Sequence, residues 1–153
     1  GYLRLGLGAP LGPLASVAPF SAWRHLNAAA KPRVVVVGIG PVLGNAVLAA
    51  AGHLPSVDLW CVGELPLSTV PEALCQAIAN TGTLICIEEH YAHGGMAGAL
   101  LLELGRAGIA IKRLVHLCAR GYPSGTYGSQ EFHRQESGLD QQSLQRWFQE
   151  LLV

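Results

Sequence analysis

The sequence predicts an α/β fold: a three-layer α/β/α sandwich with a mainly parallel, roughly five-stranded sheet. Two observations predict this class. Short apolar runs rich in valine and isoleucine recur along the chain, as expected for strands that are covered on both faces. Between these runs lie segments of helical length, some opened by proline and closed by glycine. Strands that alternate with helices imply crossover connections and therefore a mainly parallel sheet.

The first thirty residues are predicted to be a chain end and a linker ahead of the folded domain, which we assign to residues 31–153. Residues 2–5 alternate like the end of a strand, and residues 6–19 are rich in glycine and proline. Trp23 and Leu26 are expected to dock the start of the domain. The chain begins with Gly1 and its only methionine is Met96, so we expect it to be a piece of a longer polypeptide.

The first strand of the domain is predicted over residues 33–37, which include four consecutive valines. A turn at residues 38–41 leads into an Ala-rich helix over residues 42–54. Pro41 suits the first position of that helix, because the missing N–H is not needed there. A second strand follows over residues 57–62.

A second helix is predicted from Pro71 to about residue 80, followed by a strand over residues 83–88. The next helix runs from Gly94-Gly95 to Gly108, which acts as its C-cap. Four residues at helical spacing form its buried stripe: Met96, Leu100, Leu104 and Ala107. A fourth strand is predicted over residues 109–117.

Residues 119–138 have no hydrophobic periodicity, and we expect a long loop there. Loops of this length are uncommon inside compact domains and usually contact something. Asp140 is a suitable N-cap for the last helix. The apolar face of that helix is formed by Leu144, Trp147, Phe148 and Leu151.

Composition limits the classes of function. The chain has 153 residues, half of them hydrophobic and 13% charged, with a formal net charge of zero. This is enough apolar material for one buried core, whereas nucleic-acid and membrane-surface partners require clustered Lys and Arg. The low charge suggests that part of the surface is hidden against another domain or subunit.

No apolar stretch is long enough to span a bilayer. The four cysteines form no CxxC pair, so we expect free thiols in a reducing compartment and a cytoplasmic location.

The first candidate site is the glycine-rich turn at Gly38, Gly40 and Gly44, between a strand and a helix. A dinucleotide fingerprint occupies this position in α/β folds, and Glu64 lies near the end of the next strand, where a ribose-binding carboxylate belongs. The spacing is GxGxxxG, however, and Pro41 removes one backbone N–H that a pyrophosphate would use. These four residues are candidates for a small-anion site in a stand-alone nucleotide- or anion-binding module. The competing interpretation is a tight turn whose glycines allow close packing.

The second candidate is the segment Glu88-Glu89-His90-Tyr91-Ala92-His93-Gly94-Gly95, which follows a predicted strand. Open α/β sheets place their ligands at the carboxyl ends of strands. Glu89, His90 and His93 are candidates for a metal site, to which Glu88 would add a second carboxylate. No further ligand is evident. We favour a polar interface with another domain or subunit, formed by Glu88, Glu89, His90, Gly94 and Gly95.

The third candidate is the long loop, which carries many side chains able to bind or catalyse. Ser124 and Ser129 lie in no GxSxG elbow, so serine hydrolase chemistry has no support. We expect a surface loop or an interface arm. Its polar and aromatic residues are Arg120, Tyr122, Tyr127, Glu131, His133, Arg134 and Glu136.

The order of these signals resembles the C-terminal domain of transketolases. The segments on which this resemblance rests are VVVVGIGPVLGNAVLAA, LICIEEHYAHGGMAGALLLEL and SGLDQQSL. The same domain type occurs in deoxyxylulose-phosphate synthases and in the beta subunits of 2-oxo-acid dehydrogenases. The resemblance runs from about Lys31 to Val153, and residues 2–5 resemble the strand that closes the preceding pyrimidine-binding domain of those enzymes.

The resemblance implies a non-catalytic assembly domain within a dimeric enzyme that transfers two-carbon ketol or acyl groups. The cofactors implied for the full-length parent are thiamine diphosphate and Mg. In the family, a GDG motif with a later Asn holds them. This chain has two aspartates, Asp58 and Asp140, neither flanked by glycines, so we expect it to bind neither cofactor alone. The implied partners are the other domains of its polypeptide or a partner subunit, in a homo-oligomer.

Overall fold

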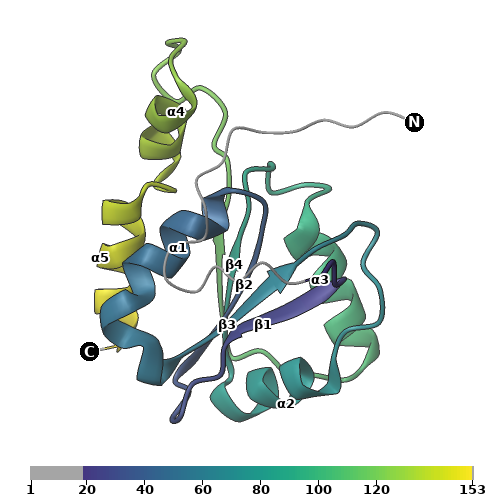
Figure 1. Ribbon diagram of the computed structural model, residues 1–153. Helices are drawn as coiled ribbons and strands as arrows, with labels where there is room; N and C mark the ends of the chain where they lie inside the picture. Colours follow the sequence, from purple (N-terminus) through teal and green to yellow (C-terminus); the bar gives the residue numbers. More distant parts are fainter. Residues whose placement is uncertain (1–18, 153) are drawn as a thin grey trace.

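A computed structural model of the protein describes residues 19–152 (Figure 1). The predicted strand at residues 2–5 lies outside this part of the chain. The elements, in chain order, are β1 (Trp23–Asn27), β2 (Val34–Ile39), α1 (Val42–Ala50), the 3-10 helix η2 (Ala51–Ser56), β3 (Val57–Val62), α2 (Glu72–Thr81), β4 (Thr83–Ile87), α3 (Met96–Arg106), β5 (Arg113–Leu117), α4 (Gln130–Ser137) and α5 (Gln141–Leu152).

The five strands form one sheet in the order β1-β3-β2-β4-β5. Four of them run parallel, and only the edge strand β1 is antiparallel to its neighbour β3. The mainly parallel five-stranded sheet predicted from the sequence is therefore confirmed. From β2 the chain moves to β3 on one side, then crosses to β4 and β5 on the other. The carboxyl ends of β2 and β4 are consequently neighbours from which the chain departs in opposite directions, which is the topological switch point of the sheet.

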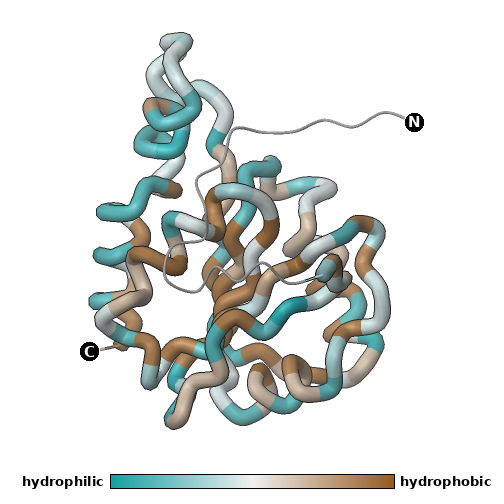
Figure 2. Tube along the Cα trace, viewed as in Figure 1, coloured by the Kyte–Doolittle hydropathy of each residue, from teal (hydrophilic) through white to brown (hydrophobic). Residues whose placement is uncertain are grey.

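Helices cover both faces of the sheet, with α1 and α5 on one face and α2 and α3 on the other (Figure 1). The valines of β2 supply both cores. Val34 and Val36 pack on the side of α1 and α5, and Val35 and Val37 pack on the side of α2 and α3. Because β2 is buried on both faces, its side chains are apolar on both, which explains the continuous run of valines. Figure 2 shows this hydrophobic centre, with polar residues on the outer helices.

Several elements differ from the prediction. Residues 23–27, placed in the linker, form β1, in which Trp23 and Leu26 pack against the two cores as expected of docking residues. The first helix gives way to η2 at residue 51, and the last strand begins only at Arg113. Ala107 was expected in the buried stripe of α3, but it follows the helix and is exposed, and Ala97 is buried instead.

The largest correction concerns residues 119–138, which we expected to be a structureless loop. Residues 130–137 form α4 instead. Figure 1 shows this segment projecting from the domain, beyond the carboxyl ends of the parallel strands. We call residues 119–138 the arm. No helix in the part of the chain that the structure describes is both long and apolar enough to cross a membrane.

Candidate functional site

The switch point of the sheet holds a cavity of about 280 Å³, which we call the switch cavity. Its walls come from the turn after β2, from Leu65 after β3 and from the segment after β4. The residues that line it are Ile39, Gly40, Pro41, Leu65, Glu88, Glu89, His90, Gly94, Gly95 and Met96. The glycine turn and the Glu-Glu-His segment, two separate candidates in the sequence, therefore meet at one shared edge of the sheet.

Glu88 lies at the floor of the switch cavity, with only 1% of its surface exposed. The backbone N–H groups of Met96 and Ala97 donate to its carboxylate at 2.7 and 3.1 Å, and His116 Nε2 donates at 2.8 Å. A carboxylate at a helix N-terminus satisfies unpaired backbone donors and interacts favourably with the helix dipole. Glu88 thus fastens the start of α3 to the end of β4.

Gly95 is required by this arrangement. A Cβ atom at residue 95 would lie 2.2 Å from Glu88 Oε2, which is far inside van der Waals contact. Gly95 also precedes α3 directly, in extended conformation. Of the residues predicted at an interface, Glu88 and Gly95 are therefore buried within the domain.

Glu89 points to the arm. Its Oε1 accepts a hydrogen bond from Arg134 Nε at 2.7 Å and another from Gln130 Nε2 at 3.1 Å. Both donors lie on α4. The ion pair ties the arm to the segment after β4, although Glu89 and Arg134 are 45 residues apart in the chain.

The proposed metal ligands do not converge in the structure. Glu89 is engaged by α4, while His90 and His93 are exposed. His90 Nδ1 bonds the carbonyl oxygen of Tyr91 at 3.0 Å. Within residues 19–152, no group of three or more His, Cys, Asp or Glu side chains could hold a metal ion. His90 and Gly94 remain as exposed residues at the rim of the switch cavity.

The glycine turn is built for packing. A Cβ at Gly38 would lie 2.5 Å from Leu43 Cδ1, and Gly40 has φ +77°, in the left-handed region that favours glycine. The N–H groups of Leu43 and Gly44 donate to the carbonyls of Gly40 and Pro41. Two donors that an anion would need at this helix N-terminus are thus already used. Glu64 is half-buried and does not line the switch cavity.

The arm contains functional residues that the sequence pattern did not place in a helix. Ser129 caps α4, since its side chain accepts a hydrogen bond from the Phe132 N–H, and Gly138 ends the helix in left-handed conformation. These two residues were the only signals in the sequence for the ends of this helix. Arg134 and His133 project from α4 toward Glu89 and Tyr122, respectively.

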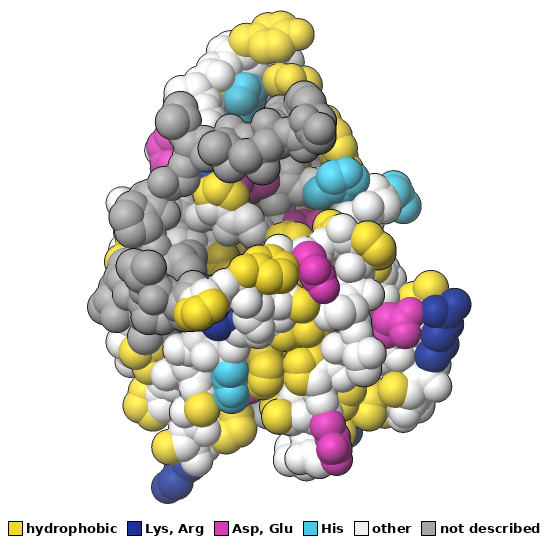
Figure 3. Space-filling view, turned by 45° about the vertical axis from the view of Figure 1, so that its right-hand side comes forward, with side chains coloured by type: hydrophobic (Ala, Val, Ile, Leu, Met, Phe, Trp, Pro, Cys, Tyr) yellow, Lys and Arg dark blue, Asp and Glu magenta, His cyan; other side chains and the backbone are white. Residues whose placement is uncertain are grey.

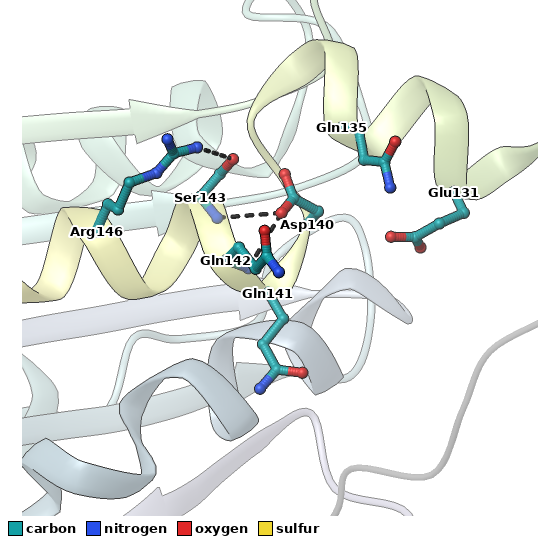
Figure 4. A pocket seen from close by; sticks show the side chains of 7 residues that line it. All are labelled: Glu131, Gln135, Asp140, Gln141, Gln142, Ser143 and Arg146. Carbon is teal, nitrogen blue, oxygen red and sulfur yellow. Dashed lines mark hydrogen bonds between the residues drawn. The ribbon is translucent and has the colours of Figure 1, made fainter.

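A polar hollow of about 360 Å³ lies where α4 meets α5 (Figure 4). Asp140 accepts hydrogen bonds from the N–H groups of Gln142 and Ser143 at 3.0 and 3.1 Å, which confirms it as the N-cap of α5. Burial acts to raise the pKa of Asp140, but hydrogen bonds from Ser143 and Gln142 outweigh it and hold the pKa below its usual value. Arg146 is turned to Ser143, to whose hydroxyl it donates. Capping explains the main contacts of this hollow.

The cysteines are free thiols throughout. Burial, with a smaller effect of the negative charge of Glu88, raises the pKa of Cys86 to about 12. Burial also raises the pKa of Cys61, Cys75 and Cys118. Thiols held in the neutral form are poor nucleophiles and poor metal ligands.

Known proteins with related sequences are deoxyxylulose-phosphate synthases and a transketolase-like protein. No family model matches the chain. The chain is 31% identical over 141 residues to 1-deoxy-D-xylulose-5-phosphate synthase of Myxococcus xanthus, covering 90% of this chain and 23% of that protein. It is 31% identical over 147 residues to 1-deoxy-D-xylulose-5-phosphate synthase 2 of Geobacter sulfurreducens, covering 91% and 22%. Mouse transketolase-like protein 1 is 32% identical over 74 residues, or 44% of this chain and 12% of that protein.

Solved structures share the fold. A split-gene transketolase, described as an inactive beta4 tetramer, matches with a TM-score of 0.65 and 19% identity over 89% of this chain and 43% of its own. Transketolase from Leishmania mexicana matches with a TM-score of 0.53 and 18% identity, over 85% and 18%. The chain spans less than a quarter of the length of its curated relatives.

Proposed function

We propose that this chain, a homologue of 1-deoxy-D-xylulose-5-phosphate synthases and transketolase-like proteins with a transketolase-like C-terminal domain fold, serves as an assembly domain. The parent enzyme uses thiamine diphosphate and Mg to transfer two-carbon ketol or acyl units. One observation carries the proposal: the homology spans 90% of this chain but only 23% of the relative. We therefore place the chemistry in other parts of a longer parent enzyme.

The side chains of this domain do not fit the cofactor. The family motif holds magnesium and diphosphate with an aspartate, and both aspartates of this chain have structural roles. Asp58 accepts from the Ala29 N–H and from Trp60 Nε1, and His25 Nε2 lies 2.9 Å from its Oδ1. Asp140 caps α5. We therefore assign the cofactor to other domains of the parent enzyme.

A calorimetric titration of this chain with thiamine diphosphate and Mg²⁺ tests the first part of the proposal. We expect no saturable heat, because no described residue offers a free aspartate. A matched titration of the full-length parent, with its own cofactor site, is the positive control. Tight magnesium-dependent binding to the lone chain, or turnover by it, would refute the proposal.

The assembly surface that we propose is the rim of the switch cavity. Glu88 and Gly95 support it from within, Glu89 is held by the arm, and His90 and Gly94 are exposed to a partner. A homo-oligomer is supported by the split-gene transketolase with the same fold, which is a beta4 tetramer. A reducing, cytoplasmic setting is supported by the four free thiols.

Light scattering after gel filtration tests this surface. His90→Glu places a carboxylate on the exposed rim, and we expect it to dissociate the oligomer with little change in thermal stability. Ala110→Glu is the control, since residue 110 is exposed at the opposite end of the sheet, before β5. A wild-type chain that is monomeric, or a His90→Glu variant that associates like wild type, contradicts the proposed surface.

A further inference from the structure

A second cavity, of about 440 Å³, lies between the arm and the sheet edge. We call it the arm cavity. Its volume is in the range of small-molecule sites, and it is built by three separate segments. The residues that matter are Glu89 and Tyr91 after β4, Gly121 and Tyr122 after β5, and Gln130 and Arg134 on α4.

Arg134 is the most buried charged group of the arm cavity, with its side chain only 12% exposed. Its hydrogen bonding is confined to one edge: Nε donates to Glu89 Oε1. Among the described residues, Nη2 is shielded from water and has no hydrogen-bond partner. The Nη pair of a guanidinium is the fork that matches the two oxygens of a carboxylate or phosphate. A buried donor without an acceptor is a cost that a ligand oxygen would remove.

Two tyrosines add donors beside this fork. Tyr91 and Tyr122 line the cavity, and each is 54% exposed. Tyr91 lies close against the backbone of Gly121, where a Cβ would be 3.6 Å from its hydroxyl, and Gly121 has φ +78°. Figure 3 shows hydrophobic side chains and a histidine at this protruding end of the molecule. The phenol groups can donate to a ligand without giving up a bond to another described residue.

Two other titratable groups line the arm cavity, His133 and Glu89, and both already have hydrogen-bond partners. His133 Nε2 accepts from the Gly128 N–H at 3.2 Å, so a neutral ring carries its proton on Nδ1, which faces Glu136 Oε2 at 3.7 Å. Glu89 is held by Arg134 and Gln130. Among the residues that line the arm cavity, the cation left for a ligand is therefore the Arg134 guanidinium, with the two phenols beside it.

We propose that the arm cavity binds a small molecule through a phosphate or carboxylate group. The Arg134 guanidinium is the main donor to the oxyanion, which reaches Nη2 by displacing the atoms that shield it, and the Tyr91 and Tyr122 hydroxyls are secondary donors. This site shares Glu89 with the switch cavity but does not depend on the proposed assembly role.

Titration of the full chain with inorganic phosphate and, separately, with malonate tests the proposal, using calorimetry and backbone amide NMR at constant ionic strength. We expect saturable binding of at least one probe, with shifts at residues 89–91, 121–122 and 130–134. Arg134→Gln should weaken binding about tenfold or more, because it removes a charge-assisted hydrogen-bond donor. Arg134→Lys should be intermediate, since it keeps the charge without the fork.

Arg106→Gln is the matched control, because Arg106 is an exposed arginine on α3 that pairs with Glu103. It should leave the affinity unchanged. If Arg134→Gln fails to fold, Tyr122→Phe deletes a single donor and should weaken binding severalfold. The probe that binds more tightly identifies the group as phosphate or carboxylate. Absence of saturable binding by both probes, equal affinity in wild type and Arg134→Gln, or shifts confined to other residues would each overturn the assignment.

Discussion

The contact between Gly95 and the Glu88 carboxylate makes each residue depend on the other. Glu88 can reach the first N–H groups of α3 only because residue 95 has no side chain. The buried charge is compensated by three donors, so it fixes the start of α3 instead of destabilising the core.

Gly95→Ala is expected to destabilise the domain by about 1–3 kcal/mol, because the new methyl group must displace the carboxylate or α3. Gly98→Ala is the control: Gly98 lies in α3 with open space around its Cα. Gly98→Ala should stabilise α3 by about 0.5–1 kcal/mol, because alanine is the better helix former. Urea denaturation measures both effects, and equal stabilities of the two variants would contradict the role of Gly95.

Cys86 is predicted to resist alkylation in the folded protein. Its pKa of about 12 leaves almost no thiolate at pH 8, and the side chain is buried. The less buried Cys75 should react first with iodoacetamide, and Cys86 should react only after urea is added. Mass spectrometry of timed samples distinguishes the sites. Equal labelling rates of both cysteines in the native state would show that the β4 core opens readily.

At the scale of elements, the sequence predicted those with a strong local pattern. The four valines of β2 indicate burial on both faces, and Asp140 marks the start of α5. The α4 helix could not be predicted from periodicity, because none of its residues is buried. It is held by a cap at Ser129 and by an ion pair with a residue 45 positions away. The partner of Arg134 is set by the tertiary fold, so the candidate site at the arm could not be assembled from sequence alone.

Asp140→Ala is expected to destabilise α5 by about 1 kcal/mol, because two backbone N–H groups lose their acceptor. The folded-state pKa of Asp140 is below its unfolded value, so its stabilisation is present above about pH 4 and is lost as the pH falls through the folded-state pKa. The stability difference between variant and wild type should therefore shrink in acid. Gln142→Ala, which leaves the accepting carboxylate intact, is the control. A difference that stays constant down to pH 2 would contradict the cap.

Across the whole molecule, one sheet joins two hydrophobic cores. Phe148 fills the core under α1 and α5, and Leu104 fills the core under α2 and α3. The central strand β2 contributes to both, so loss of β2 from the sheet would expose both cores. The sequence predicted these layers, but the edge strand β1 was missed because its residues are all half-buried or exposed and carry little hydrophobic pattern.

Phe148→Ala and Leu104→Ala are expected to lower stability by about 3–5 and 2–5 kcal/mol, respectively. Each variant should still unfold in one transition, with circular dichroism and tryptophan fluorescence melting together. Leu48→Ala, at a more exposed position of α1, is the control and should cost far less. Separate transitions for the two probes would indicate that the cores are independent units.

The direction of β1 determines where upstream polypeptide meets the domain. Trp23 is paired with Val62 at the end of β3, and the Gly63 N–H donates to the Ala22 carbonyl. The start of β1 therefore lies at the carboxyl end of the parallel strands, which is the end of the sheet that carries both cavities.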